Sequence, residues 1–476
     1  MKLSHLLKNI EILSVEGRTD VDITGIVIDG KQAEEGSLYV CLKGNFDGHD
    51  FARQAVGFGA KAVICERDCD VNATKIFVKD TRKALSLICA EFYGHPEKQL
   101  KIVGVTGTNG KTTTTYIVKH VLDKVGIKCG VIGTLGVKYG NCFKEPSLTT
   151  PDPIELFSIF NDMVKADVKV AVMEVSAHAL YWDKVEGVKF EIGVFTNLSQ
   201  DHLDFFEDIN SYALTKTKLF EKERCKYAVI NVDNKMWELI SKKANKTITY
   251  GIENPSDVFA IDIEETKEGV AYVLNLFDKI YYVNSNLMGK FNVYNSLAAA
   301  TVCALLGVKT DLIGKYLSEK IEVSGRMEKI YSGDFDVYID YAHTPDGLEK
   351  SLDSLRSVCS GKLISVFGCG GNRDSDKRKK MGEISAKIAD FTVITSDNPR
   401  FEDPMKIIRS IEDGVLSKTK NYIIVEDRLE GIKYALNYAK KGDVVLIAGK
   451  GSEKYQEILG VKRIFNDKDA VLEILS

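Results

Sequence analysis

A run of small residues followed by lysine and threonine suggests a site for phosphate groups. The run reads Thr106, Gly107, Thr108, Asn109, Gly110, Lys111 and Thr112. Backbone NH groups of such a loop, together with the start of a following helix, form a cradle for anionic phosphates. Lys111 would reach the terminal phosphates of a nucleotide, and the Thr112 hydroxyl would ligate magnesium. The usual pattern has glycine where this chain has Val105, so a glycine-rich turn without a ligand is the alternative.

Two further side chains with metal-binding chemistry lie at the ends of apolar runs. The run 168–175 carries one acid, Glu174, close to its end. A carboxylate there is costly unless it meets a cation, and ligands bind at the carboxyl ends of parallel strands. The run 192–195 leads into a loop that contains His202, whose neutral imidazole would ligate a divalent metal. Both residues are therefore candidate metal ligands.

A second group of polar side chains follows three apolar runs in the last third of the chain. Arg373 follows the run 363–367; Asp397, Asn398, Pro399 and Arg400 follow 392–395; Gly449 and Glu453 follow 444–448. The carboxyl ends of parallel strands meet at one edge of a sheet, so these loops are expected to converge on one pocket. Guanidinium groups bind carboxylates with two parallel hydrogen bonds, and Glu453 suits an ammonium group. The predicted ligand is a zwitterionic amino-acid head.

The elements that position these residues form three units. Strand-like runs at 23–28, 37–42, 62–65 and 76–78 alternate with helical patterns in the first unit, and the same alternation continues to the end of the chain. A chain of 476 residues is expected to form about three domains. Strands that alternate with helices indicate α/β domains with mostly parallel sheets. We predict an N-terminal domain over 1–98, a central ATP-binding domain over 99–326 and a Rossmann-like C-terminal domain over 327–476.

The composition is that of an ordinary globular protein. The net charge of −4 gives no reason to expect nucleic acid as a partner. Ten cysteines are scattered without any C-x-x-C pair, which favours reduced core thiols over disulfides or zinc. The N-terminal residues are too polar for a signal peptide, and no apolar run approaches the length of a membrane span. We therefore expect a cytoplasmic protein, not inserted in a membrane and monomeric.

Ordered motifs along almost the whole chain resemble the Mur ligases, which make amide bonds at the expense of ATP. They are TGTNGKT at 106–112, TTP at 149–151, EVSAH at 174–178, TNLSQDHLD at 196–204, GKFNVYNSLAAA at 289–300, DYAHTPD at 340–346, DNPR at 397–400 and GKGSE at 449–453. The resemblance implies three domains: an N-terminal one that binds a uridine nucleotide, a central ATPase and a C-terminal one that binds the incoming amino acid.

The resemblance also implies roles for residues that carry little signal by themselves. Contacts to the UDP-linked substrate are implied for Gly30, Lys31, Thr149, Thr150, Ser176 and Lys184, and contacts to ATP for Asn292, Arg326, Asp340 and His343. Lys216 stands where the family carries a carbamylated lysine that ligates a second magnesium ion. Without the resemblance, Thr150 and Asn292 are equally explained as helix caps, and Lys216 as a solvated lysine. Lys111, His202, Lys216 and Arg326 are the residues expected to serve catalysis.

The implied reaction joins UDP-N-acetylmuramoyl-L-alanyl-D-glutamate to meso-diaminopimelate. ATP and two magnesium ions would convert the free carboxylate to an acyl phosphate, which the amine then attacks. DNPR is the motif by which diaminopimelate-adding members of the family are recognised. The alternatives are ligation of L-lysine, a paralogue with altered substrates, and a ligase like folylpolyglutamate synthetase. The paralogue is suggested by Gly30, Ala177, Lys184 and Ser452, where this chain departs from the family pattern.

Overall fold

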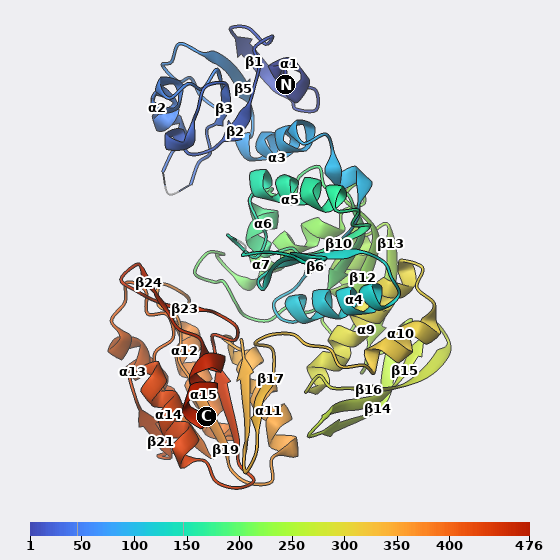
Figure 1. The fold of residues 1–476 in the computed structure, drawn as a ribbon, viewed down its shortest axis with the longest axis vertical. Helices are drawn as coiled ribbons and strands as arrows, with labels where there is room; N and C mark the ends of the chain where they lie inside the picture. The colour runs from blue at the N-terminus through green and yellow to red at the C-terminus, as the bar shows by residue number, and fades with distance from the viewer. Residues whose placement is uncertain (45, 146) are drawn as a thin grey trace.

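Three α/β units follow one another along the chain in the computed structural model, which describes residues 1–44, 46–145 and 147–476 (Figure 1). The N-terminal unit lies at the top of the view, the central unit in the middle and the C-terminal unit at the lower left. Their main sheets have 5, 11 and 6 strands. The predicted α/β class with mostly parallel sheets is confirmed, and the exact domain bounds stay a prediction.

The N-terminal unit is built on a sheet with the strand order β1-β5-β4-β3-β2. Its elements are α1 (Leu3–Leu6), β1 (Ile12–Glu16), β2 (Gly25–Val27), β3 (Ser37–Val40), α2 (Ala52–Gly57), β4 (Ala62–Cys65), β5 (Thr74–Val78) and α3 (Thr81–Phe92), with short 3-10 helices at Gly30–Gln32, Gly48–Phe51 and Pro96–Gln99. The sequence did not predict β1, the antiparallel edge strand, which is short and has apolar residues that are all exposed.

The central unit contains the largest sheet, with the order β16-β15-β14-β13-β12-β11-β6-β10-β7-β8-β9. Its elements are β6 (Lys101–Thr106), α4 (Lys111–Lys124), β7 (Cys129–Gly133), β8 (Gly136–Tyr139), β9 (Cys142–Lys144), α5 (Pro153–Lys165), β10 (Val170–Glu174), α6 (Ala177–Tyr181), β11 (Phe190–Phe195), α7 (Ile209–Thr217), a 3-10 helix (Lys218–Phe220), β12 (Cys225–Asn231), α8 (Trp237–Lys243), β13 (Lys246–Gly251), β14 (Val258–Thr266), β15 (Gly269–Leu276), β16 (Lys279–Ser285), α9 (Lys290–Leu305) and α10 (Thr310–Leu317).

The middle of this sheet is parallel and buried on both faces, which explains why its strands are almost continuously apolar. Strand β6 pairs in parallel with β10 on one side and β11 on the other. Helices α4 and α9 share one hydrophobic core with one face of these strands, and α5 shares the other core with α3 of the N-terminal unit. The carboxyl ends of β6, β10 and β11 therefore lie next to one another at one edge.

The C-terminal unit has the strand order β17-β18-β22-β19-β20-β21 and a separate hairpin of β23 and β24. Its elements are β17 (Glu328–Ser332), β18 (Asp336–Asp340), α11 (Pro345–Val358), β19 (Leu363–Phe367), α12 (Asp376–Ile388), β20 (Phe391–Ile394), α13 (Pro404–Leu416), β21 (Tyr422–Ile424), α14 (Arg428–Tyr438), β22 (Val444–Ala448), β23 (Tyr455–Ile458), β24 (Val461–Ile464) and α15 (Asp467–Leu475). All strand pairs of the main sheet are parallel except that of β17 with β18.

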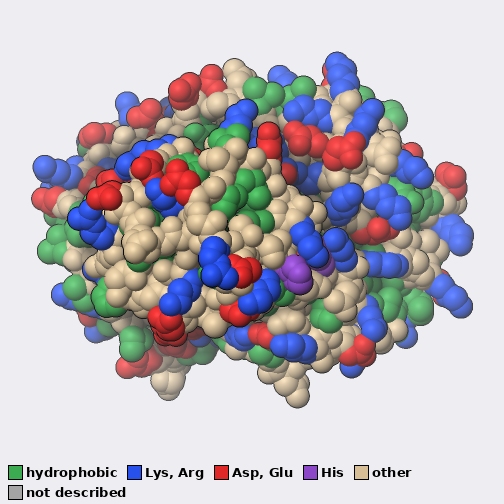
Figure 2. All heavy atoms as spheres, turned by 90° about the horizontal axis from the view of Figure 1, so that it is seen from above, with side chains coloured by type: hydrophobic (Ala, Val, Ile, Leu, Met, Phe, Trp, Pro, Cys, Tyr) green, Lys and Arg blue, Asp and Glu red, His purple; other side chains and the backbone are tan. Residues whose placement is uncertain are grey.

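The surface and the thiols agree with the composition. Basic and acidic side chains are interspersed on the face seen in Figure 2. All ten cysteines are free thiols, and all but Cys142 and Cys359 are buried. Within the described ranges, every helix is too short or too polar to cross a bilayer.

Candidate active site

The phosphate loop joins the end of β6 to the start of α4 and depends on two glycines. Gly107 and Gly110 have φ of +148° and +86°, values that side chains with a Cβ rarely adopt. A Cβ at Gly107 would lie 1.9 Å from Thr196 Oγ1, and one at Gly110 would lie 2.3 Å from Asn295 Oδ1. The loop is therefore packed against Thr196, which directly follows β11, and against α9, without room for larger residues.

Lys111 is folded back over this loop. Its Nζ donates to Gly107 O at 3.0 Å and to Thr108 O at 2.8 Å. Burial lowers the pKa of Lys111, and the carboxylate of Glu174 partly opposes that effect. An ammonium group that is partly removed from water and bound only to carbonyls is ready to exchange these partners for an anionic phosphate.

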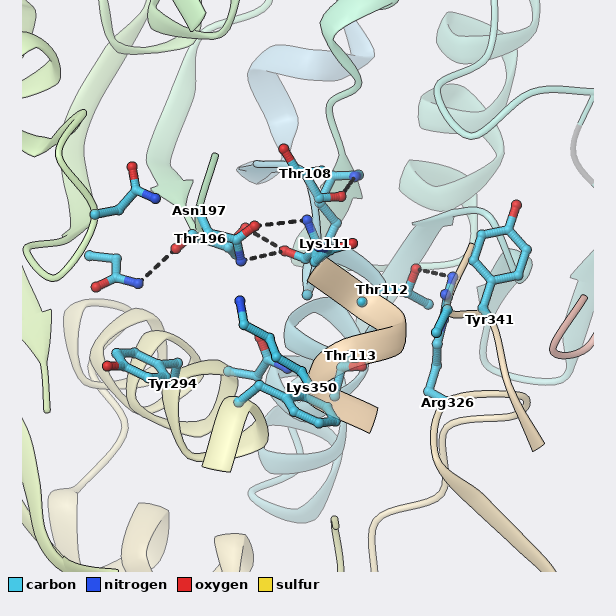
Figure 3. A pocket seen from close by; sticks show the side chains of 18 of the residues that line it. Thr108, Lys111, Thr112, Thr113, Thr196, Asn197, Tyr294, Arg326, Tyr341 and Lys350 are labelled. Atoms are coloured by element: carbon cyan, nitrogen blue, oxygen red, sulfur yellow. Dashed lines mark hydrogen bonds between the residues drawn. The ribbon is translucent and has the colours of Figure 1, made fainter. Parts of the chain in front are cut away.

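Glu174 lies at the end of β10, directly beside the start of α4. Its Oε1 accepts from Thr112 Oγ1 at 2.9 Å and from Thr134 N at 2.9 Å. The guanidinium of Arg326 donates to Thr112 Oγ1 at 3.0 Å and stacks over the Tyr341 ring, 4.1 Å from its centroid. The predicted carboxylate, hydroxyl and arginine therefore meet at one point. Figure 3 shows Arg326 extended toward Thr112.

His202 lies in the loop after β11 in a left-handed conformation, with φ of +56°. Burial lowers the pKa of His202 to about 3, although Asp201 opposes the shift. Burial opposes ionisation of Asp201, but His343 and His202 hold its pKa at about 2. The His202 ring is therefore neutral, which is the form that ligates metals. His343, from the C-terminal unit, faces the same carboxylate, with Nε2 at 3.9 Å from Asp201 Oδ2.

Lys216 is almost completely buried near the end of α7, with 1% of its surface exposed. Its Nζ donates to Gly107 O at 2.9 Å and lies 4.3 Å from the centroid of the Tyr212 ring. Burial, reinforced by the Lys111 ammonium, lowers the pKa of Lys216 well below the ordinary lysine value. The interpretation of Lys216 as a solvated lysine is wrong, whereas Lys218 is partly exposed.

A cavity of about 1400 Å³ lies between the central and C-terminal units and contains most of the predicted ATP contacts. The predicted residues that line it are Thr108, Asn109, Gly110, Lys111, Thr112, Glu174, His202, Arg326, Asp340 and His343. Figure 3 shows Lys350 reaching across the cavity from α11 toward the phosphate loop, with Tyr294 nearby. The C-terminal unit thus closes over the phosphate loop.

Three predicted ATP contacts, Thr106, Gly107 and Asn292, lie outside the cavity lining. Thr106 is fully buried at the end of β6, and Asn292 is buried in the first turn of α9, where its Nδ2 donates to Met288 O at 2.7 Å. Its helical neighbour Asn295 lines the cavity instead and donates to Asn292 Oδ1 at 2.8 Å. The two amides share a face because they are three residues apart on a helix, so Asn292 orients Asn295.

The residues predicted to contact the UDP-linked substrate fall into two places. Thr149, Thr150, Ser176 and Lys184 line the cavity on the side of the N-terminal unit, whereas Gly30 and Lys31 lie in that unit, at the 3-10 helix Gly30–Gln32. Thr150 Oγ1 donates to Glu174 O at 2.9 Å and accepts from Ser176 N at 3.0 Å. Helix α5 begins at Pro153, but the side chain of Thr150 does not cap it.

The loops after β20 and β22 meet through a buried lysine. Lys450 Nζ donates to Asn398 Oδ1 at 3.0 Å and to Glu453 Oε2 at 2.9 Å. Asn398 Nδ2 donates to the same Glu453 oxygen at 2.9 Å. A Cβ at Gly449 would lie 2.7 Å from Asp397 Oδ2. The predicted convergence of these two loops is therefore present in the structure, with Lys450 in contact with the carboxylate expected to bind an ammonium group.

Arg400 joins the third loop to this group. Its Nη1 donates to Gly371 O at 2.7 Å, and its Nε lies 3.6 Å from Glu457 Oε2 on β23. A Cβ at Gly370 would lie 2.9 Å from Arg400 Nη1 and 3.9 Å from Arg373 Cγ, so both arginines flank this glycine. Pro399 precedes Arg400 in the same loop, and Arg373 also lines the large cavity. Arg373 thus connects this group of loops with the cavity that holds the phosphate loop, whereas Arg400 is not part of the cavity lining.

Several residues of this site escaped sequence reasoning. They are Thr134, Asn197, Lys350, Lys450 and Glu457. Thr134 and Lys350 come from elements whose own pattern shows no chemistry, and only the fold brings them to the cavity. Lys450 and Asn197 lie inside motifs that the sequence did reveal, so their place in those motifs was the available signal.

Matches to family models cover most of the chain. The Mur ligase family catalytic domain matches residues 22–93, the Mur ligase middle domain matches 105–303, and the Mur ligase glutamate ligase domain matches 325–451. A relative from Clostridium acetobutylicum, named UDP-N-acetylmuramoyl-L-alanyl-D-glutamate--2,6-diaminopimelate ligase 1, is 44% identical and covers 100% of this chain and 99% of its own. A relative of the same activity name from Bacillus velezensis is 43% identical over 98% of both chains.

Solved structures give the same result. A structure of a UDP-N-acetylmuramoyl-L-alanyl-D-glutamate--2,6-diaminopimelate ligase matches with a TM-score of 0.72 and 31% identity, over 100% of this chain and 98% of that one. A MurF ligase from Thermotoga maritima in complex with ADP matches at a TM-score of 0.64 and 23% identity, over 95% and 97% of the two chains, and shows the fold alone. The chain belongs to the Mur ligase family.

Proposed function

We propose that this protein is the ATP-dependent ligase that adds meso-2,6-diaminopimelate to UDP-N-acetylmuramoyl-L-alanyl-D-glutamate in peptidoglycan synthesis. The observation that carries the proposal is the full-length match, at 44% identity, to a relative named for this reaction. The geometry supports it, because the phosphate loop and Arg373 line one cavity, and Arg373 lies beside the loops suited to an amino acid.

The reaction has two chemical steps. The free carboxylate of the UDP-linked dipeptide attacks the γ-phosphorus of ATP, giving an acyl phosphate and ADP. The amine of diaminopimelate then attacks the acyl carbon, releasing phosphate and forming the amide. Lys111 and Arg326 lie where they can neutralise charge on the transferred phosphoryl group. The two units that surround the cavity keep water away from the acyl phosphate.

The residues around Glu174 fit magnesium, which would neutralise phosphate charge when bound. Thr112 and Glu174 offer a hydroxyl and a carboxylate 2.9 Å apart, as oxygen ligands for one ion. Neutral His202 and a carbamate on Lys216 would hold a second ion. The carbamate forms when an unprotonated amine attacks carbon dioxide, and the lowered pKa of Lys216 favours that amine.

Carbamylation of Lys216 is testable by itself. In ¹³C NMR spectra of protein equilibrated with ¹³CO₂, we expect a carbamate signal in the wild type and in Lys218→Arg. Lys216→Arg should lack this signal and should lose turnover. A carbamate signal that persists in Lys216→Arg would assign the modification to another lysine.

The C-terminal loops are expected to select a zwitterionic side chain. Arg400 and Arg373 flank one glycine and offer two guanidinium groups to the distal carboxylate. Asn398 and Glu453 lie next to them and offer acceptors to the distal ammonium group. L-Lysine has no second carboxylate, so it would leave these cations without a partner.

The deciding experiment measures ADP release with UDP-N-acetylmuramoyl-L-alanyl-D-glutamate and either meso-diaminopimelate or L-lysine. Turnover with diaminopimelate alone would support both substrates. Turnover with lysine alone would support the ligase activity and contradict the proposed selection of diaminopimelate by the C-terminal loops. Silence with both amino acids would favour a paralogue with a different acceptor, as the departures at Gly30, Ala177, Lys184 and Ser452 suggest.

The same proposal places the protein in the cytoplasm, where ATP is available. It also treats one chain as the functional unit, because both substrates and ATP would meet within a cavity lined by one chain. Size-exclusion chromatography with light scattering would test the monomer directly.

A further inference from the structure

A fully buried ion pair lies beneath the loops that are expected to bind the amino acid. Arg428, at the start of α14, donates from Nε to Asp467 Oδ1 at 2.7 Å and from Nη2 to Asp467 Oδ2 at 2.8 Å. Asp467 is the first residue of α15. Both side chains have 0% exposure, and Arg428 is among the largest fully buried side chains.

The same guanidinium also binds two backbone carbonyls. Arg428 Nη1 donates to Ser396 O at 3.3 Å, and Nη2 donates to Ala448 O at 3.0 Å. Ser396 immediately precedes the DNPR motif, and Ala448 immediately precedes GKGSE. One side chain thus fixes the points at which two loops leave β20 and β22. These are the DNPR loop, 397–400, and the GKGSE loop, 449–453, which we call the recognition loops.

Stability alone is a weak reason for such a pair. Removing two charges from water costs several kcal/mol, and apolar residues of similar volume often stabilise a core as well or better. A planar guanidinium, however, presents five donors in fixed directions. It can therefore satisfy a carboxylate and two carbonyls from different strands at once, which neither an apolar side chain nor a lysine can do.

The charges above the pair are close enough to interact with it. Burial opposes the charge on Arg428, but Asp467, and less strongly Asp397 and Glu453, raise the pKa of Arg428. Asp397 and Glu453 belong to the two recognition loops, so the guanidinium acts on their carboxylates as well as on the backbone below them.

We propose that Arg428 and Asp467 are positioning residues for the amino-acid site, which set the spacing between the DNPR and GKGSE loops. This inference rests on the proposed function of those loops. The pair does not touch substrate. It holds the Asn398–Lys450–Glu453 contacts in register from below, and through them the groups that would bind the amino-acid head.

The test compares Arg428→Lys with the wild type in steady-state kinetics. Lysine keeps the charge but cannot reach both carbonyls and the carboxylate, so the loops lose their common support. We expect the KM for diaminopimelate to rise between about ten- and a hundredfold. The KM for ATP and for the UDP-linked dipeptide should change less than about twofold, because the phosphate loop is in another unit.

A matched control lies in the same sheet at the opposite end of its parallel strands, where they begin. Arg356 pairs with Asp390 at 2.6 Å and donates to the carbonyls of Gly361 and Cys359, before β19 begins. Arg356→Lys therefore removes the same type of support away from the recognition loops. It should leave the KM for diaminopimelate unchanged even where it lowers the melting temperature.

Hydrogen exchange provides a readout that does not depend on catalysis. In Asp467→Asn, which leaves the shape of the side chain intact, we expect faster exchange in 397–400 and 449–453 than in the wild type, with no change in 106–112. If Arg428→Lys does not fold, this variant carries the test.

Each outcome of these experiments is decisive. An Arg428→Lys enzyme with unchanged KM for diaminopimelate, or with all three KM values raised equally, overturns the positioning role. Equal exchange in both recognition loops of Asp467→Asn and wild type does the same. Absence of turnover in the wild type would overturn the proposed function instead. The hydrogen-exchange result would still test the positioning role of Arg428 and Asp467.

Discussion

At the scale of single residues, this site is held together by lysines that are partly or fully buried. Lys111, Lys216 and Lys450 are all bound to carbonyl, amide or carboxylate oxygens of the loops that they serve. Each position is costly for a cation unless function or a partner requires it. We propose that Lys111 exchanges its carbonyl partners for a phosphate and that Lys216 carries a carbamate, whereas Lys450 links Asn398 and Glu453.

Lys111→Ala should abolish ADP formation. The substitution removes the ammonium group nearest to the transferred phosphoryl group, so we expect turnover to fall at least about a hundredfold. Lys124→Ala, at the exposed end of the same helix, should leave turnover unchanged. Normal ADP release by Lys111→Ala in a coupled assay would contradict the proposed mechanism.

Arg400→Ala should impair recognition of the amino acid and spare ATP. Loss of a charged hydrogen-bond partner costs about 2 kcal/mol, so the KM for diaminopimelate should rise about thirtyfold. The KM for ATP should stay within about twofold, since additivity holds for distant sites. Arg409→Ala, on the exposed face of α13, is the control. An unchanged KM for diaminopimelate would remove Arg400 from the amino-acid site.

At the scale of elements, the chemistry depends on where strands end. Strands β6, β10 and β11 end side by side, which brings the phosphate loop, Glu174 and the His202 loop together. In the C-terminal unit, β19, β20 and β22 end in the three loops proposed to bind the amino acid. In both sheets the parallel pairing makes these meetings a consequence of topology.

The turn between β6 and α4 is the element most sensitive to substitution. Gly107→Ala would place a Cβ within 1.9 Å of Thr196 Oγ1 at a φ of +148°, so the loop must move. We expect at least about a tenfold loss of ATP affinity by calorimetry, because a 1 Å displacement of a binding loop is costly.

Gly126 at the other end of α4 provides a matched control. It also has positive φ, +79°, but a Cβ there would meet nothing within 4 Å. Gly126→Ala should therefore cost about 1 kcal/mol of stability and leave ATP binding intact. Equal loss of ATP affinity in both variants would indicate global destabilisation rather than a local effect on the loop.

At the scale of the whole molecule, the C-terminal unit is docked on the central unit by polar contacts around the cavity. Asn109 of the phosphate loop donates to Asp346 Oδ2 on α11 at 2.9 Å, and Lys380 donates to Gln200 Oε1 at 2.8 Å. Glu265 on β14 accepts from Ser357 Oγ at 2.8 Å. Such contacts between units are weak individually and permit opening for substrate entry.

Glu265→Ala should weaken this docking. Loss of about 1 kcal/mol of interaction predicts an apparent KM for ATP about fivefold higher. Small-angle scattering should show a larger radius of gyration without ligands, because more molecules are open. Glu264→Ala, whose side chain points to the other face of the strand, should change neither quantity. The docking role of Glu265 would be refuted by unchanged scattering together with unchanged KM.

The sequence alone determined the three α/β units and most of the motifs of the site. Apolar runs predict β6, β10, β19 and β22 because parallel strands are buried on both faces, and the loop 106–112 predicts phosphate binding because glycines and a lysine suit no other structure as well. These signals are local, so they can be read without knowledge of the fold.

Only the tertiary structure decided which residues meet. Asn295 rather than Asn292 lines the cavity, Thr134 binds Glu174, and the Arg428–Asp467 pair lies beneath two loops whose motifs begin 52 residues apart. Burial likewise distinguished Lys216 from Lys218, two lysines that the sequence pattern does not separate. The physical reason is that contacts between distant segments, and the loss of water around a charge, depend on packing in three dimensions and leave no periodic trace along the chain.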